Sequence, residues 1–190
     1  FGFASIAEDK AIFVYPDGAD RQWDLETETS KNVDIAFFDA MLASVSNSLC
    51  VDRARVFATG SSMGAFFANQ LGCRRGDVLR AIAPHSGGGP YDVASAYDEQ
   101  GHLVCPGRPV AAMVFHGEAD TSVPISDARA TVDHWSWANG CKGAPAPTAP
   151  SPCVAYPGCA RPVIFCSLPG ERHRIWSEGP KATWDFFASF

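Results

Sequence analysis

Short apolar runs alternate with longer amphipathic runs along most of this chain. The residues "AIFVYPDG" at 11–18 form an apolar run that ends in a turn. Similar short runs, each followed by glycine or by a polar turn, predict further buried strands. They lie at 54–60, 80–87, 110–120 and 162–170.

Helical periodicity fills the segments between these runs. In residues 32–49, apolar side chains recur near a spacing of three to four residues (Val33, Ile35, Phe38, Met41, Leu42 and Val45). Residues 62–72, 126–141 and 180–190 also predict helices, and Ser126 or Asp127 is the expected cap of the third. Strands that alternate with helices of this length indicate an α/β fold, with a mostly parallel sheet covered by helices on both faces.

Length and composition favour one globular domain over residues 1–190. The chain is 46% hydrophobic and 19% charged, which is an ordinary globular composition with enough apolar residues for one core. Its 21 acidic residues outnumber 15 scattered basic ones, so we expect no nucleic-acid partner. Because no apolar run approaches the roughly 18 residues that a membrane span needs, we also expect no membrane association.

Seven cysteines are many for a protein kept in a reducing compartment, so we expect disulfides and secretion. None lies in a Cys-x-x-Cys pair followed by histidine ligands, so the sequence predicts no metal site. Four of them lie in a Cys- and Pro-rich excursion at 141–166, whose prolines disfavour regular structure. The count is odd, so one thiol is free or its partner lies outside this chain.

Residues Gly60-Ser61-Ser62-Met63-Gly64 match the pattern G-x-S-x-G. A predicted strand precedes this pattern and a predicted helix follows it, and this context favours a nucleophile turn over a flexible loop. This places Ser62, rather than Ser61, at the apex of a sharp strand-to-helix turn. We expect Ser62 to be a nucleophile, and the backbone N–H of Met63 at the helix start to stabilise an oxyanion.

A serine nucleophile needs a base, and in this architecture an acid and then a histidine follow the serine along the chain. His173 lies just after the last predicted strand, from which a loop can return it to Ser62. The alternatives fit less well, because His85 comes too early, His102 lies in a loop and His134 on a helix. His116 ends a predicted strand, where we expect it to order the turn that carries the acid.

The segment "FHGEADTSVP", at the end of the strand run that begins at residue 110, offers two carboxylates, Glu118 and Asp120. Asp120 is preferred, because the extended segment after the turn brings it toward the strand ends where Ser62 and His173 should meet. Its carboxylate would accept the Nδ1–H of His173 and stabilise the imidazolium. Such a triad works without a cofactor, and none is predicted.

Four segments together resemble one known family. "DRARVFATGSSMGAFFANQL", "VFHGEADTSVP", "NGC" before the excursion and "PGERHRIW" are similar to secreted α/β-hydrolases that include poly(3-hydroxybutyrate) depolymerase-like, feruloyl and acetylxylan esterases. The resemblance runs from about residue 13 to the end. It implies the α/β-hydrolase fold, with Ser62 as nucleophile, Asp120 as acid and His173 as base.

Two departures from the family pattern carry further expectations. The glycine-rich segment around the family's histidine is here replaced by Pro169-Gly170-Glu171-Arg172-His173-Arg174-Ile175-Trp176. The family's first strand, whose His-Gly loop donates a second oxyanion N–H, has no counterpart here. We therefore expect N-terminal strands to be missing from this chain, and an N-terminal segment of the same protein to supply that donor.

The leading functional hypothesis is a secreted serine esterase that removes feruloyl or acetyl groups from plant cell-wall polysaccharide. The alternatives are a hydrolase of polyesters such as poly(3-hydroxybutyrate) and a catalytically impaired binding or remnant domain. The partner of such an esterase would be an ester substrate, either linked to polysaccharide or polymeric. Trp23, His85 and Trp176 are candidates to line its pocket, because aromatic walls suit a flat acyl ring.

The cysteines allow a specific scheme. Cys73 follows the nucleophile's helix and Cys105 precedes the strand that leads to Asp120, so we expect these two to form a disulfide. Two more bridges should join the cysteines of the excursion, in one of three possible connectivities. These four are Cys141, Cys153, Cys159 and Cys166. Cys50 remains without a partner in this chain, and we expect its partner in the N-terminal segment.

Overall fold

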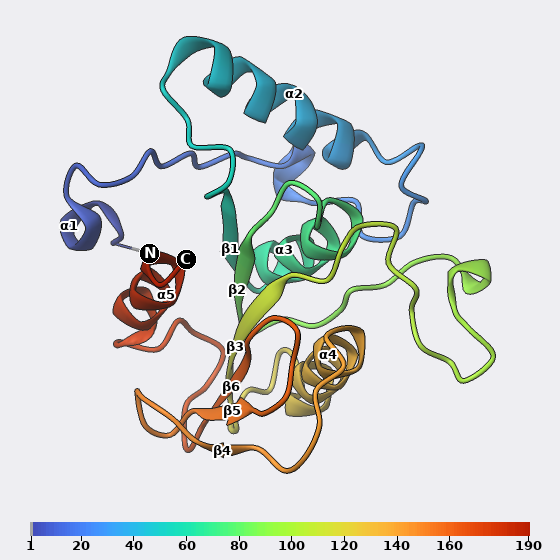
Figure 1. The fold of residues 1–190 in the computed structure, drawn as a ribbon, viewed down its shortest axis with the longest axis vertical. Helices are drawn as coiled ribbons and strands as arrows, with labels where there is room; N and C mark the ends of the chain where they lie inside the picture. Colours follow the sequence, from blue (N-terminus) through green and yellow to red (C-terminus); the bar gives the residue numbers. More distant parts are fainter. Residues whose placement is uncertain (1) are drawn as a thin grey trace.

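The computed structural model describes residues 2–190, apart from the side chain of Ala4, and holds a six-stranded sheet at its centre (Figure 1). Its strands lie in the order β1-β2-β3-β6-β5-β4. β1 to β3 and β6 pair in parallel, and β6, β5 and β4 pair antiparallel. Their bounds are β1 Phe57–Ser61, β2 Ala81–His85, β3 Ala111–Gly117, β4 Ala146–Pro147, β5 Val154–Tyr156 and β6 Val163–Leu168.

Helices cover both faces of this sheet, as Figure 1 shows. The helices are α1 Ala4–Ala7, α2 Val33–Ser48, α3 Met63–Arg74, α4 Ile125–Ala138 and α5 Gly179–Ala188, with short 3-10 turns at Ala19–Arg21 and Ala94–Ala96. α3 and α4 bury Phe67, Leu71 and Trp135 against one face, and α5 buries Phe186 and Phe187 against the other. The predicted α/β fold with a mostly parallel sheet is confirmed.

The local sequence explains where α2 starts. Asn32 precedes the helix, and its side-chain oxygen accepts hydrogen bonds from the N–H groups of Asp34 and Ile35, both at 3.0 Å. This satisfies two donors that have no acceptor within the helix. α4 starts differently from the prediction, because Pro124 precedes it and Ser126 and Asp127 lie inside its first turn. α4 begins without a side-chain cap, because proline has no side-chain oxygen that could accept from the first helical N–H groups.

Two segments differ from the sequence-based expectation. Residues 11–18 form no strand, although their apolar run is typical of one. A strand needs a neighbour for its backbone hydrogen bonds, and no strand of the described chain pairs with this segment. The excursion at 141–166 is more regular than expected, because β4 and β5 extend the sheet beyond β6.

Three disulfides link the described chain, and each involves cysteines that the sequence analysis had paired or grouped. Cys73 is bonded to Cys105, as predicted. In the excursion Cys141 is bonded to Cys159 and Cys153 to Cys166, which selects one of the three possible connectivities. The second of these ties the excursion to β6. Cys50 is an exposed free thiol.

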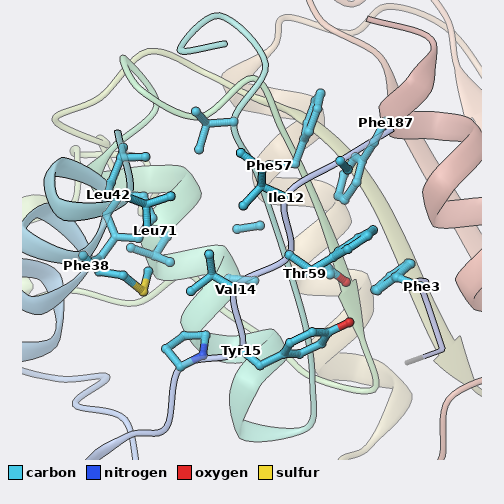
Figure 2. A pocket seen from close by; sticks show the side chains of 18 of the residues that line it. Phe3, Ile12, Val14, Tyr15, Phe38, Leu42, Phe57, Thr59, Leu71 and Phe187 are labelled. Atoms are coloured by element: carbon cyan, nitrogen blue, oxygen red, sulfur yellow. The ribbon is translucent and has the colours of Figure 1, made fainter. Parts of the chain in front are cut away.

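A cavity of about 810 Å³ lies along the outer edge of β1. Figure 2 shows its apolar side chains: Ile12 and Val14 come from the irregular N-terminal segment, Phe38 and Leu42 from α2, and Phe57 from β1. The cavity reaches Gly60 and Gly64, which flank the turn at Ser62.

Candidate active site

Ser62 occupies the single residue between β1 and α3. Its backbone has φ 53° and ψ −123°, a conformation that residues with a side chain rarely adopt. The turn is tight on one side, because a Cβ added at Gly60 would collide with the backbone carbonyl of Gly64. A Cβ at Gly64 would meet no atom within 4 Å, so only the first of the two glycines is required by close packing.

His173 reaches Ser62 from the loop between β6 and α5. Its Nε2 lies 2.9 Å from Oγ of Ser62, and its Nδ1 lies 2.7 Å from Oδ2 of Asp120. The three side chains that the sequence singled out thus form one continuous chain of hydrogen bonds. Because a carboxylate can only accept, Nδ1 carries the proton and a neutral ring leaves Nε2 to accept the hydroxyl proton of Ser62.

The carboxylate of Asp120 is closed to solvent and held at both oxygens. Oδ1 accepts hydrogen bonds from the N–H groups of Ser122 and Val123, at 2.8 and 2.9 Å, while Oδ2 faces His173. Burial by itself raises the pKa of Asp120, but the hydrogen bonds from Val123, His173 and Ser122 outweigh it and hold that pKa below the ordinary value. Asp120 therefore stays ionised beside His173.

Backbone contacts fix the loop that carries His173. The N–H of Ala119 donates to the carbonyl of Glu171 at 2.9 Å, and Gly117 packs so closely on Glu171 that a Cβ there would collide with it. On the other side, the hydroxyl of Ser86 donates to the carbonyl of Arg174 at 3.2 Å. The acid and the base thus lie on two loops that are bonded to each other.

Met63 and Trp23 lie beside the turn at Ser62. Met63 is the first residue of α3, where backbone N–H groups have no acceptor within the helix. Its Sδ lies 3.4 Å from the backbone N of Trp23, and the indole of Trp23 stacks on Phe67 with ring centroids 4.4 Å apart. Of the three residues expected to line a pocket, Trp23 is the one that lines the cavity described above.

His85 and Trp176 lie on the α5 face of the sheet. The ring of His85 is 1% exposed, stacks on Phe115 and lies 3.0 Å from the hydroxyl of Thr183. It is closed off from solvent, which differs from the expectation that it lines a substrate pocket. Desolvation lowers the pKa of His85 to about 3, so its ring is neutral. Trp176 is half-buried and packs against the apolar cluster under α5.

The rejected candidates lie away from Ser62. Glu118 is exposed and accepts a hydrogen bond from Ser167, while His102 pairs with Asp98 and stacks on Trp137. His134 on α4 contacts the sulfur of Cys105, and desolvation lowers its pKa to about 4. Sequence reasoning missed Ser86; its signal was only a short polar residue after a strand, and its φ of 52° was not visible in the pattern.

No group of three or more His, Cys, Asp or Glu side chains within residues 2–190 is arranged to hold a metal ion. The described helices also include none that is long and apolar enough to cross a bilayer.

Comparison with known proteins places this chain in a family. No family model matches the chain. The chain is 32% identical to feruloyl esterase C of Emericella nidulans over 197 residues, which cover 98% of this chain and 68% of that protein. The chain belongs to the feruloyl esterase family. Another member, a probable feruloyl esterase C of Aspergillus niger, is 30% identical over the same share of each chain.

Solved structures agree with the fold that this feruloyl esterase family member adopts. An acetyl xylan esterase from Aspergillus awamori superposes with a TM-score of 0.68 at 18% identity, covering 88% of this chain and 73% of that one. At this identity the likeness concerns the fold, which is that of α/β-hydrolase esterases.

Proposed function

We propose that this chain is a serine esterase that hydrolyses feruloyl esters, with Ser62 as nucleophile, His173 as base and Asp120 as acid. The observation that carries the proposal is the hydrogen-bonded chain from Asp120 through His173 to Ser62. Membership in a family of feruloyl esterases supports the same activity. The strained backbone at Ser62 adds support, since it holds Oγ at the apex of the turn.

In the acylation step, Oγ of Ser62 attacks the ester carbonyl while its proton passes to Nε2 of His173. The imidazolium that forms is stabilised by the ionised carboxylate of Asp120. Negative charge develops on the carbonyl oxygen, where the N–H of Met63 and the positive end of α3 stabilise it. Collapse of this intermediate breaks the ester bond, and His173 donates its proton to the leaving alcohol.

In the deacylation step, a water molecule takes the place of the alcohol and loses a proton to Nε2 of His173 as it attacks the acyl carbonyl. The resulting intermediate expels Oγ of Ser62, which recovers its proton from the imidazolium. The products are a free carboxylic acid and the unmodified enzyme. Every proton transfer passes through Nε2 of His173, the nitrogen that lies 2.9 Å from Oγ of Ser62.

The substrate class follows from the relatives, whose names give feruloyl esters as their substrates. We propose feruloyl groups esterified to plant cell-wall polysaccharide. Trp23, whose backbone N lies 3.4 Å from Sδ of Met63 and whose indole stacks on Phe67, offers an aromatic surface that suits a flat acyl ring. Secretion is part of this proposal, because three disulfides suit an oxidising compartment and a polysaccharide substrate lies outside the cell.

A fluorophosphonate probe tests the proposal, because it reacts only with an activated serine. We expect the probe to label wild-type chain at Ser62, and the Ser62→Ala variant to remain unlabelled. Ser61→Ala is the matched control, since the neighbouring hydroxyl lies at the end of β1 and should be dispensable. Absence of labelling and of ester turnover in folded wild type would favour a remnant domain instead.

A panel of three substrates tests the acyl specificity. We expect turnover of methyl ferulate to exceed deacetylation of acetylated xylan and erosion of poly(3-hydroxybutyrate) film. Faster action on the film would favour a polyester hydrolase, and faster release of acetate would favour an acetyl esterase.

A further inference from the structure

His116 is a second buried histidine beside the site, and the proton transfers above do not use it. It lies near the end of β3 and its side chain is 0% exposed. Its Nε2 lies 2.9 Å from the carbonyl oxygen of Val123 and 3.5 Å from Oδ2 of Asp120. Both neighbours are acceptors, so Nε2 carries a proton and donates it to Val123.

The bond to Val123 closes a ring that includes the carboxylate of Asp120. Val123 accepts from His116 through its carbonyl, and through its own N–H it donates to Oδ1 of Asp120 at 2.9 Å. Its neighbour Ser122 donates to the same oxygen. Asp120 and Val123 lie in one loop. His116 therefore fixes the backbone of this loop, and the loop orients the carboxylate of Asp120.

The contact between His116 and Oδ2 of Asp120 has a different role. At 3.5 Å it is too long for a strong hydrogen bond, but both side chains are closed to solvent, so the partial positive charge at Nε2–H attracts the carboxylate. His173 donates to the same oxygen at 2.7 Å. Oδ2 is therefore held between two histidines, while Oδ1 is held by backbone N–H groups.

We propose that His116 is a positioning residue for the triad: it holds the loop at Val123 so that Oδ2 of Asp120 faces Nδ1 of His173. This inference rests on the proposed function of Ser62, Asp120 and His173. A purely structural role in the core is the competing explanation. His85 provides the comparison, because its side chain is equally buried at the end of the neighbouring strand and contacts Thr183 and Phe115. Its backbone carbonyl accepts from the N–H of Ser62 at 2.9 Å, and a side-chain substitution leaves that bond in place.

The test uses variants that remove or retain the Nε2 donor. His116→Met fills the space of the ring without a hydrogen-bond donor. His116→Asn carries an amide that is too short to reach Val123. Either variant tests the loss of the donor if the other does not fold. His116→Gln can place its amide nitrogen where Nε2 lies. Each is measured with 4-nitrophenyl acetate, with kcat expressed per active site titrated by the fluorophosphonate probe.

We expect His116→Met and His116→Asn to lower kcat about tenfold or more with KM unchanged, and His116→Gln to recover most of this loss. In an Asp120→Asn background the same substitutions should change kcat by less than about threefold, because the oriented carboxylate is already gone. The matched control His85→Met should leave kcat per active site nearly unchanged in both backgrounds, even where it lowers thermal stability.

Three results would overturn the inference while leaving the proposed function intact. These are an unchanged kcat in both donor-free variants, an equal loss of kcat in the two backgrounds, and a loss that appears only in KM. The proposed function fails separately, through a wild-type chain that neither reacts with the probe nor hydrolyses the ester.

Discussion

His173 and Asp120 lie 53 residues apart in the chain, and their Nδ1 and Oδ2 atoms lie 2.7 Å apart in the fold. This bond fixes which ring nitrogen is protonated and aims the other at Ser62, 2.9 Å away. A serine hydroxyl is a weak nucleophile on its own, so the Asp120 contact determines whether the proposed chemistry can proceed.

Asp120→Asn should keep the shape of the side chain but lower kcat for ester hydrolysis by roughly 10³-fold or more, because an amide neither fixes the required tautomer nor stabilises the imidazolium. Steady-state kinetics with methyl ferulate measure the loss. Glu118→Gln is the control, since Glu118 is exposed and bonded to Ser167, and it should change kcat little. The reverse order of the two effects would identify Glu118 as the acid.

His173→Ala should lower kcat on the order of 10³-fold, because the triad acts as a unit and Ser62 then has no base. His134→Ala should retain turnover per folded molecule, since His134 lies on α4 against the disulfide sulfur of Cys105. Circular dichroism establishes folding before the kinetics are compared. Full activity in folded His173→Ala would contradict the assignment of the base.

Stability should fall as the pH is lowered from about 6.5, the ordinary histidine pKa. Desolvation lowers the pKa of His85 to about 3 and that of His134 to about 4, so in this range the unfolded chain binds protons that the folded chain does not. Each group then destabilises the fold, by roughly 1 to 2 kcal/mol at pH 5. Urea unfolding at pH 7 and pH 5 measures this change.

His85→Met should reduce the difference in unfolding free energy between pH 7 and pH 5, because the ring of His85, whose pKa is lowered by desolvation, is gone. An identical pH dependence in wild type and variant would show that groups other than His85 account for the acid sensitivity.

Replacing Cys73 and Cys105 together by alanine should lower the free energy of unfolding by roughly 3 kcal/mol. The disulfide closes a loop with a sequence separation of 32, and its removal gives that loop back its freedom in the unfolded chain. Urea denaturation measures the effect. Cys50→Ala is the matched control and should leave stability within about 0.5 kcal/mol, because Cys50 is exposed and unbonded.

Features that depend on short-range sequence were predictable. The spacing of Ile35 and Phe38 indicates the buried face of α2. Gly60 indicates the tight turn at Ser62, two residues later. The positions of Asp120 and His173 also followed, because residues after parallel strands gather at one edge of the sheet.

Features that depend on a distant partner were not predictable. The run at 11–18 has the composition of a strand, but pairing needs a neighbour that local pattern cannot reveal. Likewise, no residue near His85 in the sequence predicts that its ring contacts Thr183, which lies 98 residues later in the chain. The start of α4 was also misplaced, because the pattern offered Ser126 and Asp127 as caps, whereas the residue that precedes the helix is Pro124.

The loop between β6 and α5 carries His173, 111 residues after Ser62. A ribosome therefore completes the nucleophile's strand, turn and helix long before it synthesises the residue that removes the hydroxyl proton. In the function proposed above, a nascent chain that has not yet reached His173 carries Ser62 as an ordinary alcohol without its base. The proposed reactivity therefore requires synthesis as far as His173, which follows β6, the strand that pairs in parallel with β3.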